Sequence, residues 1–190
     1  MLRLRLRLSQ LLLLLAVAGS PAVQAADTES LLRQQLQQAL WPAEIVRLAD
    51  QYLSRFPDGP ATAEASTALA QAQQAQRVLS RNDVRLYRSA FQPAGDSRVQ
   101  DELRRAALAD REAAVRIAHW HQRGEQGVAN DQNRYVGWLQ YAAMLGDQRA
   151  SYELALHYRR DAQPVLAAQY EARAVELGFT PPRDLDHVRK

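Results

Sequence analysis

The sequence predicts an all-α protein built as a solenoid of helical hairpins, and three observations support this prediction. First, residues 106–121 superpose on residues 143–158 at an offset of 37 residues without a gap. Second, apolar residues recur at helical spacing throughout the chain. Third, alanine and leucine supply much of the apolar content, which favours helices over strands. A repeat of this period predicts that each unit buries its apolar face only against its neighbours.

The first 25 residues have the organisation of a cleavable signal peptide. Arg3, Arg5 and Arg7 form a positive region, a short apolar run follows, and small residues precede position 26. We therefore expect cleavage after Ala25 and a periplasmic or secreted protein in a bacterial source. An uncleaved membrane anchor is the alternative, but it needs about 20 apolar residues and this run is shorter.

Charge and cysteine content exclude several classes of protein. Three of the 24 basic residues lie in the leader, so the mature chain carries 21 basic and 21 acidic residues. A chain of zero net charge is not expected to bind nucleic acid. The sequence has no cysteine, which excludes disulfides, thiolate metal sites and a cysteine nucleophile.

The N-terminal region, residues 26–91, predicts three helices and a shorter fourth one. Residues 30–40 carry leucine at every fourth position, and residues 42–56 begin with a proline suited to a first helical turn. Residues 61–79 have an alanine and leucine stripe that suits either a dimer or the intramolecular core. Asn82 and Asp83 are expected to cap a shorter helix that ends near Phe91.

A turn in this region is similar to one in a known repeat family. The phrase Tyr-Leu-Ser-Arg-Phe-Pro-Asp-Gly-Pro-Ala at residues 52–61 resembles the junction between the two helices of a tetratricopeptide repeat. The resemblance covers about one repeat and implies that the N-terminal region is TPR-like.

The repeat region, residues 97–180, predicts five helices and ends before a polar tail at residues 181–190. The expected helices are residues 98–108, 110–123, 133–145, 148–160 and 164–177. Gly146 follows the third of these at the position that favours a left-handed backbone, and Asp131 precedes it as a cap. The final unit is five residues shorter than the one before it, as is common in terminal repeats.

This region resembles the Sel1-like repeat. The residues that carry the resemblance are Gly124, Gly127, Val128, Asp131, Trp138, Ala142, Ala143, Gly146, Asp147, Leu154, Ala155 and Tyr158. The loop has one extra residue between its glycines, and His121 replaces the usual aromatic residue. The resemblance implies a right-handed α-solenoid of antiparallel hairpins that scaffolds protein complexes. Some relatives of this class act in exopolysaccharide export, and others, rich in cysteine, have been associated with β-lactam hydrolysis.

No arrangement of residues in the sequence predicts catalysis, a cofactor or a metal site. His119 and His121 are two residues apart, so on a helix they point in different directions and cannot share an ion. Glu153 and His157 have the right spacing but supply only half a site. The sequence contains no phosphate-binding glycine loop and no nucleophile elbow. We therefore expect a protein that is not an enzyme.

The candidate binding surface lies on the first helix of each hairpin, which usually lines the concave side of such arrays. The residues expected to contact a partner are Arg116, Trp120, Arg123, Glu153, His157 and Arg160. We expect Trp120 to be exposed beside arginines, as in interaction hot spots; the alternative is that it packs against the N-terminal helices.

These features predict a non-catalytic adaptor or assembly scaffold that binds another envelope protein or peptide. An accessory role in exopolysaccharide export, an envelope hydrolase of the β-lactamase-like type and a spacer subunit without a binding face are the alternatives. After cleavage of the leader we expect no membrane span. The sequence identifies neither the partner nor the oligomeric state, and self-association stays open.

Overall fold

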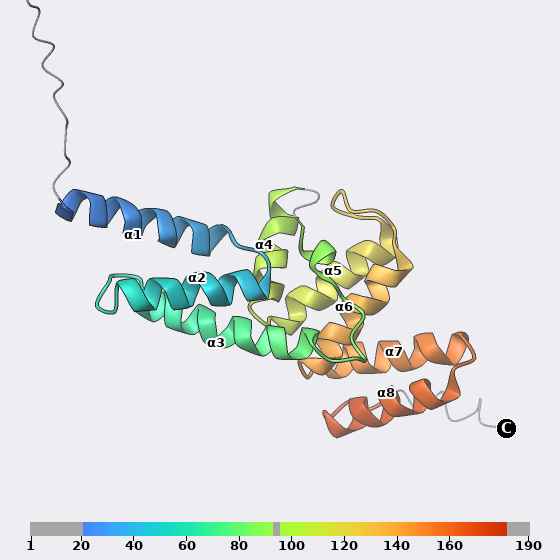
Figure 1. The fold of residues 1–190 in the computed structure, drawn as a ribbon. Helices are drawn as coiled ribbons and strands as arrows, with labels where there is room; N and C mark the ends of the chain where they lie inside the picture. Colours follow the sequence, from blue (N-terminus) through green and yellow to red (C-terminus); the bar gives the residue numbers. More distant parts are fainter. Residues whose placement is uncertain (1–20, 93–95, 182–190) are drawn as a thin grey trace, which may run out of the picture.

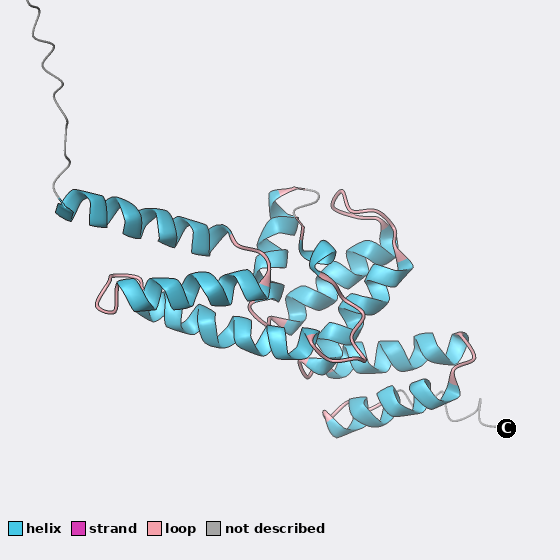
Figure 2. Cartoon of the chain, in the orientation of Figure 1, coloured by secondary structure: helices cyan, strands magenta, loops and turns pink. Residues whose placement is uncertain are grey.

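The computed structural model describes residues 21–92 and 96–181, and in this part of the chain it contains helices and no strands (Figures 1 and 2). The eight α-helices are α1 (Pro21–Gln38), α2 (Pro42–Arg55), α3 (Thr62–Leu79), α4 (Ser97–Ala107), α5 (Arg111–Arg123), α6 (Gln132–Met144), α7 (Gln148–Arg160) and α8 (Pro164–Glu176). Consecutive helices pack against each other, most extensively α2 with α3, α5 with α6 and α7 with α8. The all-α prediction is therefore confirmed for the described residues.

Helix α1 begins at Pro21, earlier than the predicted start at Ser30. Proline suits the first turn of a helix, and alanines follow it, which accounts for the earlier start. Most of the predicted leader, residues 1–20, and the end of the polar tail, residues 182–190, lie outside the described residues.

The junction between α2 and α3 is organised by Tyr52. Its buried hydroxyl donates a hydrogen bond of 2.6 Å to Glu29 of α1 and accepts one of 3.0 Å from the backbone N–H of Ala61. A Cβ at Gly59 would lie 2.6 Å from the same hydroxyl oxygen, so the turn requires glycine there. One tyrosine thus ties the first three helices together.

The alanine and leucine stripe of α3 packs inside the molecule. Ala65 and Ala72 are fully buried, and Leu69 and Leu79 are half-buried. Helix α3 contacts α2, α4 and α6. Of the two roles open to this stripe, the structure therefore assigns it to the intramolecular core.

The prediction of a short helix that begins at Asn82–Asp83 and ends near Phe91 is wrong for most of that length. Residues 84–87 have no helical structure, and only a single 3₁₀ turn, η1 (Arg88–Phe91), precedes α4. Val84 and Leu86 are buried while Arg85 and Tyr87 are exposed, which is the alternation of an extended chain. Tertiary contacts with α6 thus override the local helical signal.

The contact with α6 is close. Gln140 accepts a hydrogen bond of 2.8 Å from the backbone N–H of Arg85. A Cβ at Gly137 would lie 2.7 Å from the backbone oxygen of Arg85. In Figure 1, the segment that connects α3 to α4 crosses α6. Only a glycine at position 137 lets the backbone of residues 84–87 lie this close to the helix.

Three helices of the repeat region, α5, α6 and α7, have an aspartate at the N-cap, and that of α6 is the predicted Asp131. The side chains of Asp110, Asp131 and Asp147 accept hydrogen bonds of 2.8–3.0 Å from the N–H group three residues later. Gly146 and Gly178 follow the ends of α6 and α8, and their φ angles are +96° and +93°. Caps and glycine corners are local devices, which is why the sequence predicts them well.

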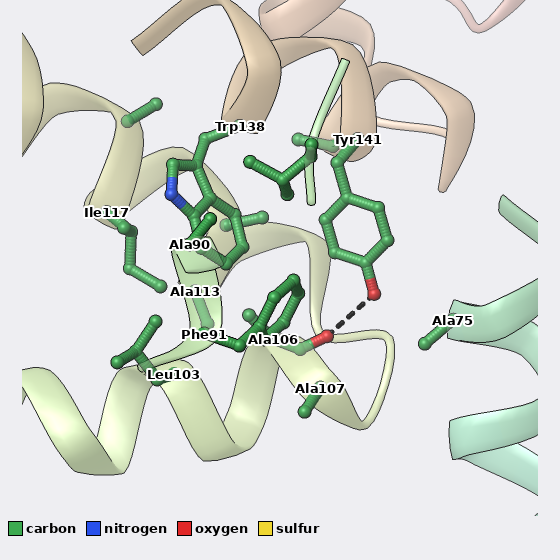
Figure 3. Packing of buried hydrophobic residues seen from close by; sticks show 14 of the residues in the cluster. Ala75, Ala90, Phe91, Leu103, Ala106, Ala107, Ala113, Ile117, Trp138 and Tyr141 are labelled. Carbon is green, nitrogen blue, oxygen red and sulfur yellow. Dashed lines mark hydrogen bonds between the residues drawn. The ribbon is translucent and has the colours of Figure 1, made fainter. Parts of the chain in front are cut away.

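A cluster of aromatic side chains lies where the two regions meet. The ring of Phe91 lies between Trp41, at a centroid distance of 5.2 Å, and Trp138 of α6, at 4.8 Å. Trp41 stands at the N-cap of α2. Figure 3 shows Phe91, Trp138 and Tyr141 packed with the alanines of α4 and α5. The N-terminal and repeat regions therefore share one hydrophobic core.

Candidate interaction surface

The structure places Trp120 in the interior, so its expected exposure is wrong. Its side chain lies on α5 and is only 6% exposed. The guanidinium of Arg98 on α4 lies 5.9 Å from the ring centroid, a cation–π contact. Helix α4 packs against α5 and covers this side of it. Trp120 is a packing residue and offers no open surface to a partner.

His157 is also removed from the expected surface. Its side chain is 11% exposed, and its Nε2 atom lies 3.3 Å from the carboxylate of Asp161 on the same helical face. The imidazole packs beside Tyr158, with ring centroids 5.2 Å apart, and edge-on to Tyr135 of α6 at 6.4 Å. It therefore belongs to the side of α7 that meets α6 and α8.

The other four predicted residues follow the side of α5 and α7 that carries most of their polar residues. Arg116 is half-buried, and its Nη2 donates to Glu102 of α4 at 2.9 Å. Arg123 is exposed and makes two hydrogen bonds of 2.7 and 2.9 Å with Glu125. Arg160 is exposed as well, and its positive charge helps to lower the pKa of Glu153.

Glu153 is the centre of a network that joins three helices. His119 of α5 approaches its two carboxylate oxygens at 2.9 and 3.1 Å, and the hydroxyl of Tyr135 on α6 donates to it at 2.8 Å. Burial raises the pKa of this carboxyl, but the hydrogen bonds from His119 and Tyr135 outweigh burial and hold the pKa below its usual value. The same hydrogen bond raises the pKa of His119.

A groove of about 650 Å³ lies between the N-terminal halves of α5 and α7. Its lining residues are Arg111, Glu112, Val115, Arg116, Gly146, Asp147, Gln148, Arg149 and Leu177. Of its two carboxylates, that of Asp147 caps α7 through a bond of 2.8 Å to the N–H of Ala150. Glu112 lies 3.9 Å from Arg116. We call this feature the α5–α7 groove.

Two arginines of the groove have no carboxylate partner. Within the described residues, no Asp or Glu oxygen lies within 4.0 Å of the guanidinium of Arg111 or Arg149. Among the described residues, Arg111 makes one side-chain hydrogen bond, of 3.3 Å, to the backbone oxygen of Gly146. Their guanidinium groups are therefore free to bind a carboxylate from outside the chain.

Three residues of this surface were missed by the sequence argument, namely Arg111, His119 and Arg149. The helical period of α5 could have identified His119 as a residue of this surface. Positions 112, 116, 119 and 123 follow one face of α5, and positions 149, 153, 156 and 160 follow the equivalent face of α7. Choosing position 120 instead of 119 moved the prediction by about 100° around the helix, into the core.

Comparisons with known proteins found no match to the chain among protein-family models, curated proteins or solved structures. In the described residues, no three His, Asp or Glu side chains are placed to hold a metal ion together. Among the helices that the structure describes, none is both long enough and apolar enough to cross a membrane.

Proposed function

We propose that this protein is a non-catalytic interaction scaffold of the bacterial envelope that binds an acidic peptide segment of another protein in the α5–α7 groove. The supporting observation is the pair of arginines, Arg111 and Arg149, that line one groove without carboxylate partners. Guanidinium groups bind carboxylates through two parallel hydrogen bonds. Val115 and Leu177 add apolar contact beside them.

The overall arrangement that we propose is a right-handed solenoid of antiparallel helical hairpins of the Sel1-like class. The most extensive contacts join α2 with α3, α5 with α6 and α7 with α8, and weaker ones link these pairs in chain order. Asp110 and Asp147, which are 37 residues apart, make the same N-cap bond. In such an array, α5 and α7 are the helices that line the concave side.

A peptide-binding measurement tests the groove. Fluorescence anisotropy is recorded with two labelled peptides, one of alternating glutamate and leucine and one of alternating lysine and leucine. We expect the acidic peptide to bind, and its affinity to fall as salt is added, because the contacts are charged and exposed. The double variant Arg111→Glu/Arg149→Glu should weaken its binding at least tenfold.

The matched control is Arg55→Glu, which reverses an exposed arginine at the end of α2, outside the groove. This variant should retain the affinity of the wild type for the acidic peptide. Equal binding of the two peptides, or equal loss in the control and in the double variant, would show that the groove does not select acidic segments.

Location is tested separately. The predicted leader requires that protein recovered from the envelope fraction of a bacterial host begins at Ala26. Intact-mass measurement of that fraction determines the N-terminus directly. Recovery of the uncleaved chain from the cytoplasm would contradict the proposed location and leave the binding experiment unaffected.

A further inference from the structure

A second recess lies near the C-terminal end of α7, away from the α5–α7 groove, where α6, α7 and α8 meet residues 82–87. It has a volume of about 710 Å³. Its lining residues are Asn82, Asp83, Arg85, Tyr87, Gln132, Asn133, Val136, Gly137, Gln140, His157, Tyr158, Asp161, Gln163, Leu166 and Tyr170. We call it the α6 cleft. Nothing in the proposed function uses it.

Uncharged hydrogen-bonding groups dominate this cleft. Asn82, Gln132, Asn133 and Gln163 are exposed amides, and no hydrogen bond joins their side chains to other described residues. The charged residues are mostly occupied, since Asp83 is paired with Arg81 at 2.8 Å and Asp161 lies 3.3 Å from His157. The cleft therefore suits a ligand that offers neutral donors and acceptors.

Two largely buried tyrosines direct hydroxyl groups to this cleft. Tyr170 of α8 is 6% exposed, and its hydroxyl has no hydrogen-bond partner in the described part of the chain. Tyr158 of α7 is 7% exposed; its hydroxyl accepts a bond of 2.8 Å from Gln140, and no described residue accepts its proton. The Tyr170 hydroxyl is open to solvent, unlike the buried and unpartnered Tyr152 hydroxyl, so both tyrosines of the cleft can donate to a ligand that offers acceptor oxygens.

The chain itself shows how this face of α6 holds an extended backbone. Gln140 accepts from the N–H of Arg85, and Gly137 leaves room for the Arg85 carbonyl, as described above. Asn133 lies two turns before Gln140 on the same face of α6, about 10.5 Å along the axis at 1.5 Å per residue. That distance corresponds to about three residues of extended chain at 3.3 Å each. The side-chain amide of Asn133 has no hydrogen-bond partner among the described residues and is therefore available to a second segment on this face of α6.

We propose that the α6 cleft binds an extended, uncharged peptide segment through its backbone, with Asn133, Gln163 and the Tyr170 hydroxyl as hydrogen-bonding residues. Val136 and Leu166 line the same cleft and receive its apolar side chains. A neutral oligosaccharide also offers hydroxyl groups to amides and tyrosines. The peptide is favoured because this face of α6 already binds one extended backbone by a glutamine side chain.

The experiment starts from a phage-displayed library of random dodecapeptides, panned against the mature chain. Selected peptides are synthesised and their affinities measured by isothermal titration. Tyr170→Phe removes only the hydroxyl and keeps the ring stacked on Tyr158, so it should fold and should weaken binding about fivefold. Asn133→Ala should weaken binding by a similar factor.

Recognition of the peptide backbone is separated from recognition of peptide side chains by two further measurements. Methylating the peptide's backbone nitrogens one at a time should lower affinity at least tenfold at some positions. The control variant Gln74→Ala, on the exposed face of α3, should bind like the wild type. Circular dichroism confirms that each variant retains its helices.

The proposal is overturned if the library yields no binder, or if binders are insensitive to Tyr170→Phe and Asn133→Ala. It is also overturned if no methylated position loses affinity. Maltotriose and chitotriose are titrated in parallel, and binding of either that depends on Tyr170, with no peptide recovered, would assign the cleft to a glycan. These results do not depend on Arg111 or Arg149, so the two sites are tested independently.

Discussion

The buried hydroxyl of Tyr141 donates a hydrogen bond of 2.7 Å to the backbone oxygen of Ala106, which joins the end of α6 to the end of α4 (Figure 3). The next unit has an equivalent bond, from Arg173 Nε of α8 to the backbone oxygen of Ala143 in α6, at 2.9 Å. The two acceptors are 37 residues apart in the sequence and the two donors 32, the same offsets as for the helices themselves. Successive units thus repeat a connection although the donor has changed.

Tyr141→Phe should destabilise the fold by about 1–2 kcal/mol. The substitution leaves the shape of the ring unchanged but deprives a buried carbonyl of its side-chain donor. Burial raises the pKa of this tyrosine, so its hydroxyl stays protonated and available as a donor. Urea unfolding followed by circular dichroism measures the change. Tyr87→Phe is the control, because that side chain is 71% exposed, and a shift of equal size in the control would disprove the role of the bond.

Ala109→Gly should stabilise the protein by about 0.5–1 kcal/mol. Ala109 follows α4 with φ of +62°, and Gly146 holds the equivalent position after α6 with φ of +96°. An alanine in the left-handed region costs about 1–2 kcal/mol of folding free energy, which Ala109→Gly removes. Part of that stabilisation is lost because glycine makes the unfolded chain more flexible.

The reverse substitution, Gly146→Ala, is the matched partner of this experiment. Only the end of Arg111, at 3.7 Å, approaches the position of a Cβ there, so any loss reports the backbone angle and not a clash. Thermal unfolding should show opposite shifts for the two variants. Shifts in the same direction would mean that the two corners are not equivalent.

Gly137→Ala should destabilise the fold, although alanine is the better helix former by about 1 kcal/mol. The new methyl group would meet the Arg85 carbonyl at 2.7 Å and push residues 84–87 away from α6. We expect a net loss of about 1–3 kcal/mol, typical of overpacking. Ser66→Ala, at an exposed position of α3, is the control: it gives the smaller propensity gain of alanine over serine without a new contact. If Gly137→Ala is as stable as that control, the segment is not held as described.

The pH dependence of stability should depend on His119. Its pKa is raised in the folded state, chiefly by the hydrogen bond to Glu153, above an ordinary value of 6.5. The bond therefore contributes its full stability below pH 6.5, and the contribution is lost as the pH rises through the folded-state pKa. The difference in unfolding free energy between the wild type and His119→Gln should shrink over that range.

Two neighbouring groups act at other pH values. Burial lowers the pKa of His121, so its protonation destabilises the fold below pH 6.5. The lowered pKa of Glu153 makes its contribution disappear in acid. His121 and Glu153 both remain in the His119→Gln variant, although Glu153 loses its hydrogen bond to His119. Titration of the His119 ring by NMR gives the folded-state pKa directly, and a value at or below 6.5 would contradict the assignment.

The sequence predicts the elements whose signals are local. Helix α7 has its predicted bounds because a capping aspartate and an arginine-rich end lie within the helix or beside it. Residues 84–87 could not be predicted, since their extended form depends on Gly137 and Gln140, about 55 residues later. Trp120 was misplaced although the helical period puts it on the apolar face of α5 with Ala113 and Ile117; only the identity of the helix that covers it, α4, depends on tertiary structure.

The position of Phe91 between Trp41 and Trp138 has a consequence for how the molecule is assembled. The first tryptophan is near the beginning of the described chain, and the other belongs to its third quarter. Neither can be fully shielded from water until the chain between them has folded back. A protease cut after α3 would leave indole surface open on both fragments, so the polypeptide is expected to survive, or be degraded, as a single unit.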